Sequence, residues 1–173
     1  MKNLTVIFAL LMLFSLPSQA QNWWKSGISG EGPTVTRTLD LDDFAGIRLT
    51  NNAKVYIRQG SPQSVEVEAQ ENIIDNLKRE VQDDTWTIGF DRSVRRYDGM
   101  KVYITIPHLE GLRVSGSGSI TSEGRFTDVD DLGVSISGSG DIRLDVDATS
   151  VDSHISGSGN IELRGNTGHH EIS

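Results

Sequence analysis

Hydrophobic and polar residues alternate along most of the chain after residue 33. A two-residue period is typical of strands that bury one face. Turn-forming residues separate the runs, for example at Asn51-Asn52 and Gly60-Ser61-Pro62. The pattern therefore predicts an all-β fold. The hydrophobic positions with this spacing include Val55, Ile57, Val65, Val67, Trp86, Ile88, Phe90, Val102, Ile104 and Ile106.

One segment departs from the two-residue period. Ile73, Ile74, Leu77 and Val81 have helical spacing. This spacing predicts one short helix near residues 71–78. The segment 34–39 is rich in β-branched residues and is predicted to form the first strand of the domain.

The second half of the chain contains a short repeated block. The sequences SGSGSI, SGSGDI and SGSGNI begin at Ser115, Ser137 and Ser156, about 20 residues apart. A period near 20 in a strand-rich sequence is typical of repeats that stack on one another. It predicts a parallel β-helix, or solenoid, with about 20 residues per rung.

Alignment on these blocks assigns the faces of each rung. Ile136 and Ile142 are expected to point inward and Asp141 outward, because a buried hydrophobic column stabilises stacked strands. The glycines are expected at corners that need a positive φ or a close backbone approach. The aligned hydrophobic columns are Val114, Ile136 and Ile155, then Ile120, Ile142 and Ile161, then Leu144 and Leu163.

The last residues begin another repeat without finishing it. Ile172-Ser173 matches Ile155-Ser156, but no Gly-Ser-Gly follows. One expectation is that the C-terminal rungs are missing, so that the exposed end of the solenoid self-associates through its unpaired strand. The alternative is a genuine C-terminus with an imperfect last rung.

The first 20 residues resemble an export signal. A positive start at Lys2, an apolar run from Leu4 to Leu16, and small residues before Ala20 predict a signal peptide cleaved after Ala20. An uncleaved N-terminal anchor is the alternative. The expected organisation is a signal peptide at 1–20, a flexible leader at 21–33 and the β-solenoid domain at 34–173. No transmembrane segment is expected in the mature chain.

Charge and composition exclude several classes of protein. The 173 residues include 16 Lys and Arg against 24 Asp and Glu, which gives a net charge of −8. An acidic chain does not suit nucleic acid, which binds basic surfaces. The absence of cysteine excludes disulfides, thiolate metal sites, a cysteine nucleophile and a lipoprotein anchor.

These features together resemble the head GIN domain family, auto-transporter adhesins common among secreted proteins of the Bacteroidetes group. The resemblance implies an all-β fold with a parallel β-helix and provides no catalytic residues. Family members usually carry further GSG rungs, which this chain lacks. The segments that carry the resemblance are 34–39, 44–47, 55–60, 64–67, 102–107 and the three SGSG blocks.

Two groups of residues are candidates for binding. Trp23 and Trp24 form an aromatic pair suited to sugar rings, or they pack over a nearby apolar edge. The basic segment around Tyr97 suits an anionic glycan, or it is an ordinary charged loop. Its candidate residues are Arg92, Arg95, Arg96 and Tyr97.

Motifs for catalysis and cofactor binding are absent from the sequence. The four histidines lack zinc-site spacing, and there is no nucleophile elbow or phosphate-binding loop. No cofactor is therefore expected. Aspartates cluster in the repeats and offer candidate ligands for calcium, and His169-His170 with Glu171 could bind a metal or form a solvated turn. Asp145 and Asp147 alternate with hydrophobic residues, however, which is typical of a solvent-exposed face.

Three functional hypotheses follow. The first is an exported, non-enzymatic solenoid that binds a glycan or a cell-surface protein at the cell envelope, in the periplasm or outside the cell. The second is a polysaccharide lyase or a pectinase-like enzyme, because such enzymes use parallel β-helices. The third is a self-associating envelope scaffold.

Overall fold

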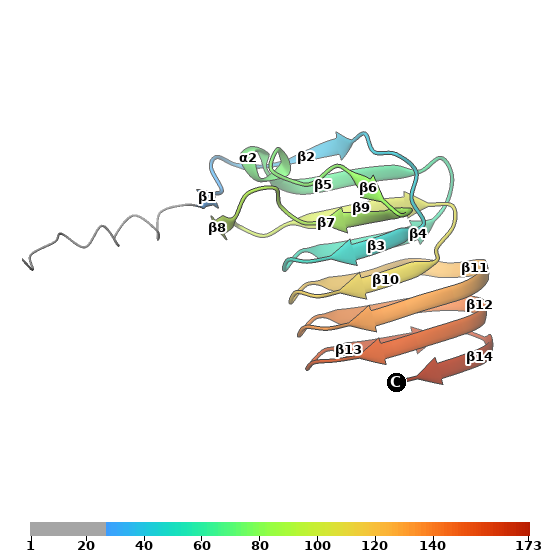
Figure 1. Ribbon diagram of the computed structural model, residues 1–173. Helices are drawn as coiled ribbons and strands as arrows, with labels where there is room; N and C mark the ends of the chain where they lie inside the picture. Colours follow the sequence, from blue (N-terminus) through green and yellow to red (C-terminus); the bar gives the residue numbers. More distant parts are fainter. Residues whose placement is uncertain (1–26) are drawn as a thin grey trace, which may run out of the picture.

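Within residues 27–173, the alternating residues form strands that join into one twelve-stranded sheet, accompanied by a small pair of strands and one short helix (Figure 1). The computed structural model describes residues 27–173, so the predicted signal peptide and residues 21–26 of the leader lie outside it. The elements are β1 (Ile28–Ser29), β2 (Thr34–Leu39), β3 (Gly46–Leu49), β4 (Lys54–Gln59), β5 (Ser64–Gln70), α2 (Glu71–Ile74), β6 (Val81–Gln82), β7 (Thr85–Ile88), β8 (Val94–Arg96), β9 (Lys101–Ile106), β10 (Gly111–Val114), β11 (Ser119–Ile136), β12 (Asp141–Ile155), β13 (Asn160–Arg164) and β14 (Thr167–Ile172).

Two long strands curl this sheet around its core. The start of β11 pairs with β4, and its end pairs with β10. Strand β12 follows β11 along both parts and then pairs with β13 and β14. The sheet therefore turns back on itself, and its two halves face each other, as the stacked front and rear strands in Figure 1 show.

The all-β prediction is confirmed, but the predicted parallel β-helix is not: the architecture is a curled sheet. Residues 123–132 lie within the long strand β11, where two bulges help the strand to bend. The N-terminal part also adds antiparallel pairs, β2 with β5 and β5 with β9, which a parallel helix would lack.

The predicted register of the repeats is confirmed. Ile120 pairs with Ile142, which pairs with Ile161, and Val114 pairs with Ile136. The side chains of Ile136 and Ile142 are fully buried. Ile155, at the open end of the stack, is 40% exposed because fewer strands cover it. Hydrophobic burial therefore fixes which residues of each repeat face inward.

The repeated glycines are explained by close packing between strands. A Cβ atom at Gly138 would lie 2.3 Å from the carbonyl oxygen of Gly116, and one at Gly157 would lie 2.3 Å from that of Gly138. None of these three residues has a positive φ. Of the two expected reasons for glycine here, the structure supports the close approach.

The helix is shorter than the 71–78 predicted. It ends at Ile74, and Leu77 forms a β-bridge with Phe90 instead of continuing the helix. The indole Nε1 of Trp86 donates a hydrogen bond of 3.0 Å to the Lys78 carbonyl oxygen. These pairings with the neighbouring strand region satisfy backbone groups that a longer helix would have used.

Asp147 stabilises the turn between β13 and β14. Its Oδ1 accepts hydrogen bonds from the backbone N–H of Asn166 at 2.8 Å and from the Asn166 side chain at 2.9 Å. These bonds, followed by the nearby Arg125 guanidinium, lower the pKa of Asp147 from its ordinary value of 3.8. A lowered folded-state pKa stabilises the fold above pH 3.8, and this contribution is lost as pH falls through the lowered value.

We therefore expect the Asn166 backbone amide to report the protonation of Asp147. In an NMR titration, its chemical shift should change with a midpoint below pH 3.8. Asp147→Asn should abolish this change, since the ionisable acceptor is gone. A midpoint at or above 3.8 would contradict the hydrogen bonds described for this turn.

Candidate functional site

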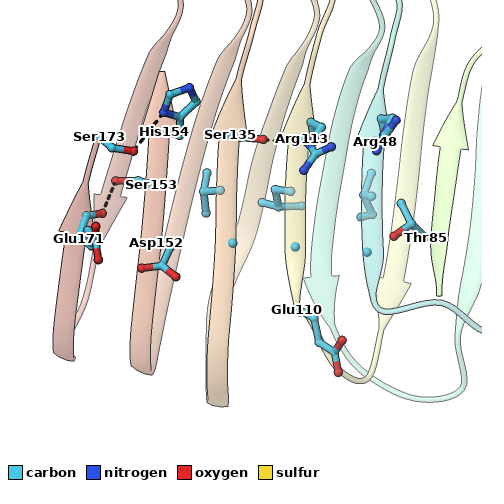
Figure 2. Close-up of a pocket in the computed structure, with 16 residues that line it drawn as sticks. Arg48, Thr85, Glu110, Arg113, Ser135, Asp152, Ser153, His154, Glu171 and Ser173 are labelled. Atoms are coloured by element: carbon cyan, nitrogen blue, oxygen red, sulfur yellow. Dashed lines mark hydrogen bonds between the residues drawn. The ribbon is translucent and has the colours of Figure 1, made fainter. Parts of the chain in front are cut away.

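A groove crosses the outer face of the sheet half formed by β7, β3, β10, β11, β12 and β14 (Figure 2). Its volume is about 520 Å³. It runs across the strands, so each strand contributes only one to three side chains. The labelled residues that line it are Arg48, Thr85, Glu110, Arg113, Ser135, Asp152, Ser153, His154, Glu171 and Ser173.

Three glycines in register form the floor of the groove. Gly46 pairs with Gly111, and Gly111 pairs with Gly133. A Cβ atom at Gly111 would have no neighbour closer than 3.6 Å, and one at Gly133 none closer than 3.9 Å. Neither of these two residues has a positive φ. Neither packing nor backbone conformation therefore requires glycine at 111 or 133, and their effect is to leave the backbone bare.

Two arginines line one side of this floor. Arg48 and Arg113 are paired in register on neighbouring strands, and both are exposed. Their side chains lie next to each other in Figure 2. Arg113 Nε donates a hydrogen bond of 3.1 Å to Ser135 Oγ. Within residues 27–173, neither guanidinium forms an ion pair.

Hydroxyl and imidazole groups line the C-terminal end of the groove. His154 Nδ1 lies 3.1 Å from Ser173 Oγ. The buried Ser153 hydrogen-bonds through its Oγ, at 2.9 Å, to Nε2 of His170, which does not line the groove. Asp152 adds a carboxylate on the same strand. The groove therefore has two unneutralised cations at its centre and polar, partly acidic groups at this end, an arrangement suited to a polar ligand with an anionic group.

The basic segment predicted as a binding site lies elsewhere. Arg92, Arg95 and Arg96 are exposed, at or next to β8, and none of them lines the groove. Tyr97 is half-buried, and its hydroxyl hydrogen-bonds to Asn52.

The environment of Tyr97 is largely apolar. Its ring packs edge-on against Phe90, with 5.7 Å between ring centroids. Burial raises the pKa of Tyr97, an effect that a hydrogen bond with the backbone of Asn52 partly opposes. The predicted role of this segment stays a prediction, as does that of Trp23 and Trp24, which lie outside the described residues.

A repeated motif marks the groove in the sequence. The tripeptides Gly46-Ile47-Arg48 and Gly111-Leu112-Arg113 have the same pattern, and Gly133-Val134-Ser135 follows it with serine in place of arginine. In each strand a buried hydrophobic residue separates the glycine from the polar residue; Gly111 and Gly133 are accessible, whereas Gly46 is buried. This glycine–hydrophobic–arginine pattern was the signal that could have located the site.

The clustered aspartates are partly neutralised by arginine. Arg125 Nε lies 2.7 Å from Asp145, and its NH1 lies 3.4 Å from Asp147. Across residues 27–173, no three potential metal-binding side chains come close enough to form a metal site. In the same part of the chain, no helix has the length and hydrophobicity needed to cross a membrane.

Comparisons with solved structures show similar folds. A "putative lipid binding protein" from Parabacteroides distasonis has a TM-score of 0.72 and 25% identity, over 81% of this chain and 62% of that one. A "putative adhesin" from the same species has a TM-score of 0.68 and 19% identity, over 84% and 71% of the two chains. A "putative adhesin" from Bacteroides fragilis has a TM-score of 0.61 and 20% identity, over 85% and 95%.

The sequence comparisons identify the family. The chain spans only 62% of the length of the first of these structures. No curated protein matches it in sequence. A family model described as "Putative auto-transporter adhesin, head GIN domain" matches residues 43–173, which is most of the chain. This protein therefore belongs to the head GIN domain family, as its strand motifs and SGSG repeats predict.

Proposed function

We propose that this protein is an exported, non-enzymatic binding module that holds a glycan in the groove of Arg48 and Arg113. The observation that carries this proposal is the pair of adjacent guanidiniums without an ion-pair partner in residues 27–173, beside Gly111 and Gly133, where packing does not require glycine. Arginine forms bidentate hydrogen bonds with carboxylates, phosphates and sulfates. An acidic glycan would place such a group on the arginines and a sugar ring on the bare floor.

Both features lower the stability of the protein when no ligand is bound. Glycine in a strand loses more conformational entropy on folding than alanine does, at a cost of about 0.5–1 kcal/mol per residue. Like charges opposite each other on neighbouring strands repel, which also destabilises a sheet. Gly111, Gly133, Arg48 and Arg113 together are therefore better explained by a ligand than by the stability of the fold.

The family and the N-terminal sequence support a location in the cell envelope. Two of the similar structures are described as adhesins. The predicted signal peptide, cleaved after Ala20, would direct the mature chain out of the cytoplasm. An adhesin exposed there would meet surface glycans directly. The self-associating scaffold and the polysaccharide-acting enzyme are the alternatives to this function.

A glycan-array screen tests the proposal. We expect the exported protein to bind acidic glycans, and the double variant Arg48→Gln/Arg113→Gln to lose about tenfold or more in affinity. The matched control Arg92→Gln/Arg95→Gln removes the same charge outside the groove and should bind as the wild type does. Equal losses in the two variants would show a general charge effect and overturn the groove assignment.

Two further measurements separate this function from its alternatives. Flotation with anionic phospholipid vesicles tests lipid binding, which the description of one similar structure suggests for that protein. Chromatography of a polysaccharide after incubation tests for cleavage. Binding to vesicles but to no glycan, or the release of shortened oligosaccharides, would contradict the proposed function.

A further inference from the structure

Two tyrosines stack on the outer face of the opposite half of the sheet. Tyr56 on β4 and Tyr103 on β9 are paired in register. Their ring centroids lie 5.3 Å apart, and the ring planes differ by 16°. This separation is too small for rings that lie edge to edge. The rings are therefore stacked face to face, and their free faces point along the row of strands.

The next two positions in this row leave a space beside Tyr56. Tyr56 pairs with Thr121 on β11, and Thr121 pairs with Arg143 on β12. Neighbouring strands are about 4.8 Å apart, so Tyr56 and Arg143 are separated by about 9.6 Å along the row. Threonine is too short to fill the space above it. Tyr103 and Thr121 flank Tyr56 on the two neighbouring strands. The distance from the Tyr56 ring to a ligand ring placed over Thr121 would therefore be about the same as its distance to the Tyr103 ring.

Arg143 forms the far wall of this space, and two carboxylates lie near its guanidinium. Its Nε lies 3.6 Å from Glu162, and its NH2 lies 3.9 Å from Asp141. A hollow of about 210 Å³ that Tyr56 does not line lies beside this space, between Thr121, Arg143 and Glu162. We call the space between Tyr56 and Arg143, above Thr121, the ring slot.

The rim of the ring slot is polar and carries both charges. Ser119 and Glu123 lie two residues to either side of Thr121 in the same strand, so they share its face. Lys54 is paired with Ser119, and Asp141 is paired with it on the other side. Hydroxyls and carboxylates at a rim suit the hydroxyl groups of a sugar, and the mixed charge favours a ligand without net charge.

We propose that the ring slot binds a neutral hexopyranose ring, with the C–H face of the sugar packed on the free face of Tyr56. An aromatic ring binds an apolar face by burying surface area and through the quadrupole of its π-system. The polar edge of the sugar would then reach the rim. The hydroxyls of Tyr56 and Tyr103 form no hydrogen bond within residues 27–173, so both remain available at that edge. The slot lies on the opposite half of the sheet from the groove and does not depend on the function proposed for it.

NMR with ¹³C-labelled tyrosine rings tests this site on the exported protein. The probes are the methyl glycosides of glucose, galactose, mannose and N-acetylglucosamine, each titrated separately. At least one should shift the Tyr56 ring signals in a saturable manner. Tyr56→Ala should weaken binding by about tenfold, whereas Tyr56→Phe should retain most of it.

Filling the slot provides a matched variant that keeps the fold. Thr121→Tyr places a third ring in the row and should abolish binding without lowering the unfolding temperature, because aromatic cross-strand neighbours stabilise sheets. The proposal is overturned if none of the four glycosides shifts the Tyr56 signals, if Thr121→Tyr binds as the wild type does, or if p-cresol binds the slot and the glycosides do not. Loss of groove binding in the Arg48/Arg113 variant would leave these results unchanged.

Discussion

Replacing Ile142 by aspartate should unfold the C-terminal part of the sheet. Ile142 is fully buried between Ile120 and Ile161, so the new carboxylate would lose its water without gaining a partner. Together with the lost hydrophobic burial, this should lower the free energy of unfolding by about 4 kcal/mol or more. Urea denaturation followed by circular dichroism measures the change.

The neighbouring Asp141 provides the control for this experiment. Its side chain faces outward, and its contact with Arg143 is long, at 3.9 Å. Asp141→Asn should therefore change the free energy of unfolding by no more than about 0.5 kcal/mol. Equal destabilisation by Ile142→Asp and Asp141→Asn would show that the assigned faces of β12 are wrong.

The two kinds of glycine should respond oppositely to alanine. Gly138→Ala would place a Cβ atom 2.3 Å from the backbone oxygen of Gly116, so the neighbouring strands must move apart. We expect a loss of about 3 kcal/mol in the free energy of unfolding. In Gly111→Ala the new Cβ atom would have no neighbour closer than 3.6 Å. This variant should leave the free energy of unfolding unchanged or raise it by up to about 1 kcal/mol.

Thermal unfolding of both variants beside the wild type provides the measurement. The comparison is direct, because each substitution adds the same methyl group to a strand or corner of the same sheet. Similar unfolding temperatures for the two variants would mean that the backbones at Gly138 and Gly116 do not pack as closely as the structure shows.

The sequence predicts the strands and their register well, because burial of one face requires hydrophobic residues at every second position, and this alternation is present in every repeat. Ile142 and Ile136 could be assigned to the inner face from the SGSG alignment alone. The curl of the sheet could not be predicted in this way. Glu123, Gly124 and Asp128 are typical of a turn, yet the backbone around them continues to pair with β12 through bulges.

The groove was harder to predict because its residues are far apart in the sequence. Arg48 and Arg113 become neighbours only when β3 pairs with β10. Arg92, Arg95 and Arg96 are close in sequence, but closeness in sequence says little about a surface made by stacked strands. The repeated Gly-x-Arg pattern becomes meaningful only once the strand that precedes each corner is aligned across repeats.

The most direct test of the proposed function is to fill the groove without disturbing the fold. Gly111→Leu places a side chain at the centre of the glycine floor, where a Cβ atom has space. Isothermal titration of the strongest array ligand should show affinity reduced by about tenfold or more, while the unfolding temperature stays at or above that of the wild type. Unchanged affinity in a folded Gly111→Leu variant would contradict the assignment of this groove as the binding site.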